Sequence, residues 1–284
     1  MNQSEADDAS KAALFAFYGG LTGLVTCNLL LNFPANVYVL WLIVNGVRGA
    51  VASEFFSLNL AVLEIIFCVS SLFIMLNFLL RLEVEAILSL LQCFVQLVFI
   101  FRPLFQSCIC MERYLAVVHP TTFLRFKPLR YKSAFCLLNW LLVSLYCIIL
   151  SVTLSGIQVA YHLIGNSTFF LLVMSYCGLH ILCVLKQPEP GNKDQVRKSR
   201  SVVKRKAFKV IMITLVFTSS LQLLQILILW VSLLFTKEQA ILNISLVSLA
   251  ISMVSGLMTP LLHLYRQRKL PCVSEQAFAV PQTF

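Results

Sequence analysis

The chain has 284 residues, of which 59% are hydrophobic and only 12% are charged. An ordinary soluble domain carries about 25% charged residues, so this composition excludes a soluble globular protein and indicates a polytopic membrane protein. The formal net charge of +10 does not indicate nucleic-acid binding, because no soluble segment combines a basic face with interspersed aromatic residues. The four histidines show no metal-ligand spacing, and no HExxH, P-loop or GxSxG motif is present. We therefore expect neither an enzyme nor a cofactor.

The N-terminal residues 1–12, MNQSEADDASKA, are polar and acidic. They lack the positive segment that begins a secretory signal peptide, so we expect the first apolar run to stay in the protein as a membrane anchor. Residues 1–16 are then an N-terminal tail. Asn2 begins an Asn-Gln-Ser triplet and is a glycosylation candidate if this tail is extracellular.

Seven apolar runs follow, each near the roughly 20 residues that a helix needs to cross about 30 Å of hydrocarbon. They cover residues 17–46, 55–80, 86–114, 133–156, 167–187, 206–235 and 240–265. Because lipid offers no hydrogen-bond partners to the backbone, such long runs must be helical. The sequence thus predicts an all-α membrane protein, a seven-transmembrane helix bundle over residues 17–265.

The charges of the loops predict the orientation of this bundle. One side of the membrane receives most of the lysines and arginines: Arg48, Arg125, Lys127, Arg130, Lys132, Lys193, Arg197, Lys198, Arg200, Lys204, Arg205, Lys206, Lys209, Arg266, Arg268 and Lys269. The other side receives Lys11, Arg81 and Lys237. Positively charged loops remain in the cytoplasm, so we expect the N-terminus outside the plasma membrane and a cytoplasmic C-terminal tail over residues 266–284.

Two candidate modification sites lie in a predicted outer loop and in the C-terminal tail. The outer loop over residues 156–167 contains Asn166, which begins an Asn-Ser-Thr glycosylation triplet. The longest loop, 187–205, is predicted to be cytoplasmic. Cys272, beside a basic stretch of the C-terminal tail, is a palmitoylation candidate, with a free thiol as the alternative.

The third run ends in Cys108-Ile-Cys-Met-Glu112-Arg113-Tyr114, followed by His119-Pro120 and a basic loop. Charged residues at the edge of the hydrocarbon are costly, so they need lipid headgroups, a partner or a function. This Glu-Arg-Tyr sequence resembles the acidic-Arg-Tyr signature of rhodopsin-like (class A) G-protein-coupled receptors. The resemblance implies that Glu112, Arg113 and Tyr114 couple to the G protein, and that Glu112 and Arg113 form a cytoplasmic lock that holds helix 3 against helix 6.

Further residues resemble the same family over about residues 20–265. Asn36 in the first helix matches an asparagine that bonds neighbouring helices in the family. The segment Leu58-Asn-Leu-Ala-Val-Leu-Glu64 is similar to the family's LNLAxxD, with Glu64 where aspartate is usual. Trp140 matches the structural tryptophan of helix 4, and Pro260 the proline of helix 7. The resemblance implies a buried polar core that contains Asn36, Glu64, Arg102, Ser255, Thr259 and Pro260.

The sequence also departs from the family pattern. Helix 6 has Leu221-Gln222-Leu223 where the family has Trp-x-Pro, so we expect a straighter helix there. The Asn-Pro-x-x-Tyr of helix 7 is replaced by Thr259-Pro-Leu-Leu-His263. The family's outer disulfide is expected to be absent. The loop TTFLRFKPLRYK after His119-Pro120 looks most like the nucleotide, protease-activated and lipid receptor branch.

Arg102 and Glu64 are predicted to form an ion pair within the membrane. Arg102 precedes Arg113 by close to three helical turns, so both lie on nearly the same face of helix 3. In the family, a small polar residue at this level binds a sodium ion together with the carboxylate of helix 2. An unpaired arginine in hydrocarbon costs at least about 2.5 kcal/mol, so we expect Arg102 to pair with Glu64 in place of the sodium ion. An unpaired Arg102 in a water-filled cavity is the alternative.

The predicted function is a receptor that passes an extracellular signal from an unknown ligand to heterotrimeric G proteins. A ligand cavity between helices 3, 5, 6 and 7 would be lined by Gln92, Gln96, Tyr161, Gln222 and Gln225, although these residues could equally bond between helices. A receptor that no longer couples, such as a decoy, scaffold or partner subunit, is one alternative. A light-driven pump is disfavoured because the seventh run contains no lysine. The GxxxG pattern at Gly19–Gly23 leaves homo- or hetero-oligomers open.

Overall fold

The chain folds almost entirely into long helices in a computed structural model, which describes residues 3–46, 51, 54–80, 85–126, 128–153, 156–186, 195–235 and 238–266. The elements in chain order are α1 (Gln3–Cys27), the π-helix η1 (Asn28–Asn32), α2 (Phe33–Val44), α4 (Phe55–Leu79), α5 (Glu85–Val118), α6 (Pro120–Phe126), α7 (Leu129–Thr153), α8 (Gly156–Lys186), α9 (Gln195–Leu234) and α10 (Glu238–Arg266).

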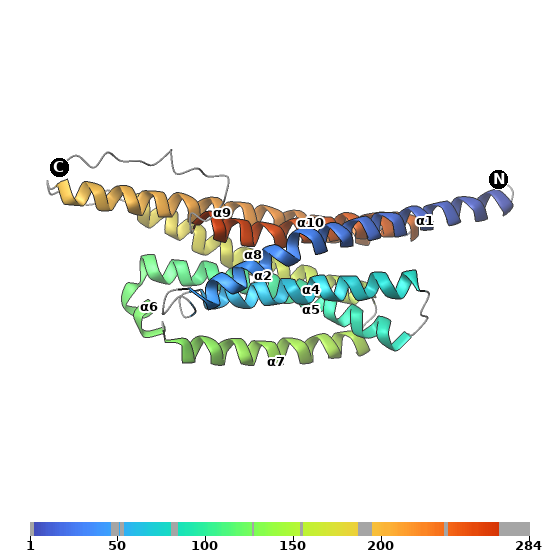
Figure 1. The fold of residues 1–284 in the computed structure, drawn as a ribbon, viewed down its shortest axis with the longest axis horizontal. Coiled ribbons are helices and arrows are strands. Elements are labelled where there is room, and N and C mark those ends of the chain that lie inside the picture. Colours follow the sequence, from blue (N-terminus) through green and yellow to red (C-terminus); the bar gives the residue numbers. More distant parts are fainter. Residues whose placement is uncertain are drawn as a thin grey trace.

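The helices run side by side in an elongated bundle (Figure 1). In Figure 1, α7 lies along one side, and α9, α10 and α1 lie along the opposite side, with α4 and α5 between them. α5 packs against α4, α7, α8 and α9, so it is the central helix. The N-terminal part of α1 projects from one end of the bundle, and α6 lies at the other end.

Six helical segments of the described chain are long and apolar enough to cross a membrane. They cover Phe15–Val44, Phe55–Asn77, Leu129–Leu150, Ile157–Val184, Leu215–Leu234 and Asn243–Leu261. These segments coincide with six of the seven predicted runs and confirm an all-α, multi-pass membrane protein. The remaining run corresponds to α5, which has 34 residues and carries Arg102, Glu112 and Arg113. Its central position lets these charged side chains find protein partners instead of lipid.

Two helices extend into segments that the sequence predicts to be loops. α8 begins at Gly156, so the expected outer loop over residues 156–167 is helical in the structure. Val159 and Ile164 are buried there, because an apolar face continues along the helix beyond the predicted span. α9 likewise begins at Gln195, within the expected loop 187–205. Neither extension contains a proline, so nothing in the backbone ends these helices at the membrane edge.

Two of the described helices contain a proline beyond their first turn. Pro103 lies inside α5 and Pro260 lies inside α10. A proline within a helix removes one backbone donor and kinks the helix. α9 contains no proline and is continuous from Gln195 to Leu234, in agreement with the straighter sixth helix that the sequence predicts.

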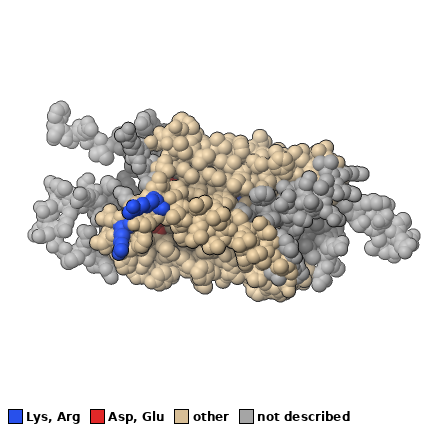
Figure 2. Space-filling model, turned by 90° about the horizontal axis from the view of Figure 1, so that it is seen from below, with Lys and Arg blue, Asp and Glu red and all other residues tan. Residues whose placement is uncertain are grey.

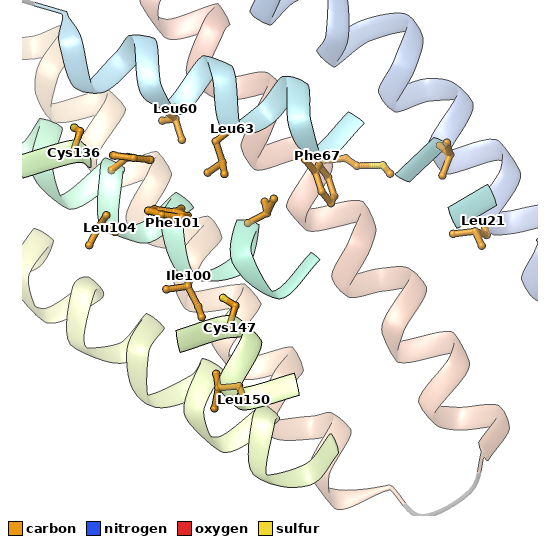
Figure 3. Packing of buried hydrophobic residues seen from close by; sticks show 14 residues of the cluster. Leu21, Leu60, Leu63, Phe67, Ile100, Phe101, Leu104, Cys136, Cys147 and Leu150 are labelled. Carbon is orange, nitrogen blue, oxygen red and sulfur yellow. The ribbon is translucent and has the colours of Figure 1, made fainter. Parts of the chain in front are cut away.

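The main apolar core lies between α4, α5 and α7 (Figure 3). Leu60, Leu63 and Phe67 of α4 face Phe101 and Leu104 of α5. Cys147 and Leu150 of α7 pack near Ile100 on the other side of α5, and all of these side chains are buried. This core packs α5 against α4 and α7.

The outer surface of the bundle is apolar. Leu137, Leu141 and Leu145 on α7 are more than half exposed, which would be costly in water but is favourable in hydrocarbon. Figure 2 shows that the described part of one face carries almost no charged side chains, and that its lysines and arginines lie at one end. This distribution agrees with a bundle whose sides contact lipid.

Candidate functional site

A buried ion pair joins α4 to α5 in the interior of the bundle. Nε of Arg102 donates to Oε1 of Glu64 at 2.6 Å, and Nη2 donates to Oε2 at 2.7 Å. The side chains are 8% and 1% exposed, respectively. Two parallel charge-assisted hydrogen bonds are the strongest arrangement of an arginine and a carboxylate. The structure thus contains the pairing that the sequence predicts.

The seventh helix of the bundle, α10, completes the surroundings of this ion pair. Nη1 of Arg102 donates to the hydroxyl of Ser252. The guanidinium carbon also lies 5.3 Å from the ring centroid of Phe67, within the range of a cation–π contact. On the carboxylate side, Gly256 lets the backbone of α10 approach Glu64 closely. The pair therefore holds α4, α5 and α10 together.

Replacing Gly256 with alanine is expected to destabilise the bundle. A Cβ atom at this position would lie 2.5 Å from Oε2 of Glu64, which cannot move without losing its bond to Arg102. Overpacking of a rigid interior costs typically about 1–3 kcal/mol, so the detergent-solubilised protein should melt at a lower temperature. Gly23→Ala is the matched control, because a Cβ there meets nothing within 4 Å. Equal melting temperatures for the two variants would contradict this close approach.

Three asparagines extend the polar interior along the first helical segment. Asn28, Asn32 and Asn36 are 1%, 2% and 1% exposed. Asn28 donates to the hydroxyl of Ser71 on α4 at 3.4 Å, and Asn32 donates to the carbonyl of Met253 on α10 at 2.9 Å. These two residues therefore connect the first helical segment to its neighbours.

Asn36 has a different role from the expected one. It donates to the carbonyl of Asn32 within its own helical segment, at 2.9 Å, and the bonds between helices belong to Asn28 and Asn32. The reason is the π turn η1, whose additional residue changes the direction of the side chains before it relative to those after it. The spacing of the three asparagines by four residues was the sequence signal for this polar stripe.

The other predicted members of the polar core lie on α10. Thr259 donates to the carbonyl of Ser255 one turn earlier, at 3.3 Å, and Pro260 is buried inside the helix. Ser255 lines a cavity that Arg102 and Ser252 also line. Ser255 is half-buried, and its membership of the polar core stays a prediction. Ser252, which was not among the residues expected in the polar core, makes the direct contact with Arg102.

Trp140 attaches α7 to the central helices. Its indole Nε1 donates to Oδ1 of Asn59 on α4 at 3.2 Å. Its ring centroid lies 4.3 Å from that of Phe101 and 6.1 Å from that of Phe105, both on α5. These contacts agree with the structural role expected for Trp140.

Two more ion pairs lie near the α6 end of the bundle. Lys132 on α7 contacts Glu112 at 2.7 Å, with side chains 7% and 9% exposed. Nη2 of Arg113 lies 3.3 Å from Oε1 of Glu54, and the other oxygen of Glu54 accepts a bond from Ser57 at 3.2 Å. Glu112 therefore links α5 to α7, and Arg113 links α5 to the start of α4.

These contacts correct the expected lock between Glu112 and Arg113. Neighbouring residues project about 100° apart on a helix, so the two side chains reach different elements. The side chains of residues 195–212 at the foot of α9 lie outside the described part of the structure, and the contact of helix 3 with helix 6 there stays a prediction. Glu54 was not predicted as the partner of Arg113. Its position directly before the second apolar run, at the same predicted side of the membrane as Arg113, could have indicated the pair.

Tyr114 lies in an aromatic cluster between α5 and α8. Its ring centroid is 5.4 Å from that of His180 on α8 and 5.8 Å from that of His119, both in edge-on arrangements. Tyr176, also on α8, lies 6.3 Å away. The cluster attaches the end of the Glu-Arg-Tyr segment to the fifth helix of the bundle.

The predicted ligand-binding residues do not all lie in one place. Gln222 and Gln225 line a cavity of about 40 Å³ between α5, α8, α9 and α10. Gln96 is buried on α5 but does not line this cavity. Tyr161 is 53% exposed and packs edge-on against Trp230, so it does not belong to this cavity. The side chain of Gln92 lies outside the described part.

The folded structure argues against glycosylation of Asn166. This residue lies inside α8, and its Nδ2 atom, to which a glycan would be attached, is buried. The predicted outer loop is helical at this position, which explains why the amide of Asn166 is buried instead of exposed. The other two predicted modification sites, Asn2 and Cys272, lie outside the described residues.

Comparison with known proteins supports a receptor. No curated protein matches the chain. A family model does match over residues 35–159, from Asn36 through the Glu64–Arg102 pair to Trp140. Receptors of this family are not enzymes, which agrees with the prediction. The matched segment, residues 35–159 of this multi-pass membrane protein, is similar to the 7 transmembrane receptor (rhodopsin family).

Proposed function

We propose that this protein is a plasma-membrane receptor that transmits an extracellular signal to heterotrimeric G proteins. The observation that carries the proposal is the Glu112-Arg113-Tyr114 segment at the end of α5, within the residues that match the rhodopsin family. The asymmetry of loop charge supports an orientation in which this end of α5 faces the cytoplasm. Arg113 is then on the side where a G protein binds.

We propose that the pairing of Arg113 with Glu54 holds the receptor in a resting conformation that does not couple to a G protein. While Glu54 holds the guanidinium, it competes with any acidic or carbonyl group of a G protein for the same donors. The side chain of Arg113 is 26% exposed and that of Glu54 is 10% exposed, so the pair is within reach of a partner protein. We propose that activation breaks this bond and shifts a two-state equilibrium toward the coupling conformation.

The Arg102–Glu64 pair supports a receptor that works without bound sodium. Both carboxylate oxygens of Glu64 accept bonds from Arg102, so the negative charge that would attract a cation is neutralised within the protein. The guanidinium itself repels a sodium ion. We propose that this permanent pair replaces the ion that the family resemblance places between helices 2 and 3.

Expression of the full chain with a G-protein dissociation reporter tests the proposal. We expect basal dissociation above that of cells lacking the protein, and we expect Arg113→Ala to remove it because the coupling guanidinium is lost. Arg125→Ala is the matched control, since Arg125 is an exposed residue of α6 at the same end of the bundle. If Arg113→Ala and Arg125→Ala signal alike with every G protein tested, the chain does not couple through this site.

A further inference from the structure

An open groove lies between α7 and α8, near the predicted outer edge of the membrane. Both helices pack against α5 but, within the described part of the chain, hardly against each other, so a space remains between them. It measures about 430 Å³, and small-molecule sites typically measure about 300–1,000 Å³. Its lining residues are Tyr146, Tyr161, His162, Gly165, Asn166 and Phe169.

The groove opens on a surface that faces lipid. Leu142 and Ile149, each about one turn from Tyr146 on α7, are 55% and 50% exposed, and Phe169 on α8 is 60% exposed. Large apolar side chains exposed to this extent are favourable in hydrocarbon and costly in water. An occupant of the groove therefore enters it from the lipid phase.

A polar pair spans the groove from one helix to the other. The hydroxyl oxygen of Tyr146 lies 3.1 Å from Nδ1 of His162, and the two rings meet edge-on. Both side chains are exposed, although both residues belong to membrane-crossing segments, Leu129–Leu150 and Ile157–Val184. In either neutral tautomer of His162, the pair keeps one further donor and one further acceptor. A hydroxyl group, which both donates and accepts, matches this arrangement.

Gly165 keeps the groove open one turn further into the membrane. A Cβ atom at this position would meet nothing within 4 Å, so no close packing requires a glycine here. Gly178 on the same helix is different, because a Cβ atom there would lie 2.6 Å from the side chain of Leu215. The space beside Gly165 can therefore hold part of a ligand without any movement of the helices.

The lining residues also determine the charge of the ligand. They include no lysine, arginine, aspartate or glutamate, so nothing in the groove would neutralise a phosphate or a carboxylate. We propose that this groove binds an uncharged single-chain lipid of the monoacylglycerol class. Its hydroxyl-bearing head lies at Tyr146 and His162, and its acyl chain runs deeper into the membrane, along Gly165 and Phe169.

The groove is connected to the sixth helix of the bundle. Tyr161, which the sequence predicts to contact a ligand, lines this groove and packs edge-on against Trp230 of α9, with ring centroids 6.4 Å apart. A lipid against Tyr161 would favour one position of Trp230 and so bias the arrangement of α9. This step rests on the proposed receptor function, in which the sixth helix moves, whereas binding in the groove does not.

Photolabelling of the full chain in phosphatidylcholine nanodiscs tests the binding. The probe is a monoacylglycerol with a diazirine in its acyl chain, and the control is the fatty acid with the same diazirine, ionised in alkaline buffer. We expect the monoacylglycerol to label residues 157–169 at several times the yield of the acid. Equal labelling by both probes would overturn the proposal. Displacement of the probe by cholesterol as readily as by unlabelled monoacylglycerol would also overturn it.

Variants of the groove provide a second test. Gly165→Leu fills the groove, and His162→Phe removes both ring nitrogens but keeps an aromatic ring, so each should lower the labelling several-fold. Gly23→Leu is the matched control, because Gly23 is an exposed glycine of α1 where a Cβ atom also meets nothing within 4 Å. An equal decrease with Gly23→Leu, or no decrease with either groove variant, would overturn the proposal. Labelling does not require a G protein, so a chain that fails to couple would leave this result unchanged.

Trp230→Leu tests the connection to α9. This variant should keep the photolabelling, because Trp230 does not line the groove. It should remove the change in G-protein dissociation that added monoacylglycerol produces in the unmodified chain. A variant that still responds, or an unmodified chain that couples through Arg113 but does not respond to the lipid, would overturn the connection.

Discussion

Glu64→Gln and Arg102→Met are each expected to abolish most surface expression, whereas the double variant should recover much of it. Each single change leaves one partner of the ion pair in the interior without its counter-charge. Removal of one partner of a buried pair typically costs about 3–5 kcal/mol, while replacement of both is often nearly neutral. Arg102→Met should be the more damaging of the two single variants. It leaves the carboxylate of Glu64, whose side chain is only 1% exposed, without a counter-charge.

Surface labelling of intact cells and thermal melting in detergent measure this effect. Arg125→Met serves as the control for loss of an arginine, since Arg125 is exposed on α6. If both single variants reached the surface at the normal level, the pair would not be needed for folding. A double variant no better than the worse single variant would show that each residue acts separately, through Ser252 or the cavity instead of through its partner.

Glu54→Gln is expected to raise basal G-protein activation about fivefold. The amide keeps the size of the side chain but loses the charge that holds Arg113 at 3.3 Å. Because the Arg113 side chain is partly exposed, the pair is worth only about 1 kcal/mol, which corresponds to about a fivefold change in a two-state equilibrium. Ser57→Ala should produce a smaller rise, since Ser57 positions the other carboxylate oxygen of Glu54.

The dissociation reporter measures this change at matched surface expression. Glu112→Gln is the informative comparison, because Glu112 pairs with Lys132 in a more buried site. It should lower expression because Lys132 loses this carboxylate in a buried site, without the same rise in activity per receptor. Basal activity unchanged by Glu54→Gln would show that Glu54 does not hold the resting state.

Several features of the fold and the site were predictable from local sequence. Apolar runs of the length needed to cross hydrocarbon identify the helices, because backbone groups in lipid have no alternative partners. The Arg102–Glu64 pair was predictable for a similar reason. Both residues lie at mid-depth in apolar runs, where an unpaired charge is costly, and helical spacing places Arg102 on the face of Arg113.

Other features depend on three-dimensional contacts. The boundaries of α8 and α9 were missed because membrane thickness predicts where a helix leaves the lipid and not where it ends. The partners of Glu112 and Arg113 were not predicted, because the sequence shows that a side chain is charged but not which neighbouring element it faces. Lys132 and Glu54 come from different elements, and only packing brings them to α5.

The amino-acid sequence by itself determined an all-α, multi-pass membrane protein and the need to neutralise Arg102, since hydrophobic length and intramembrane charge act locally. The tertiary structure decided which side chains meet: Asn28 and Asn32 instead of Asn36, Glu54 with Arg113, and three glutamines around one cavity. These contacts depend on the π turn and on the rotation of each helix, which arise from the packing of the whole bundle.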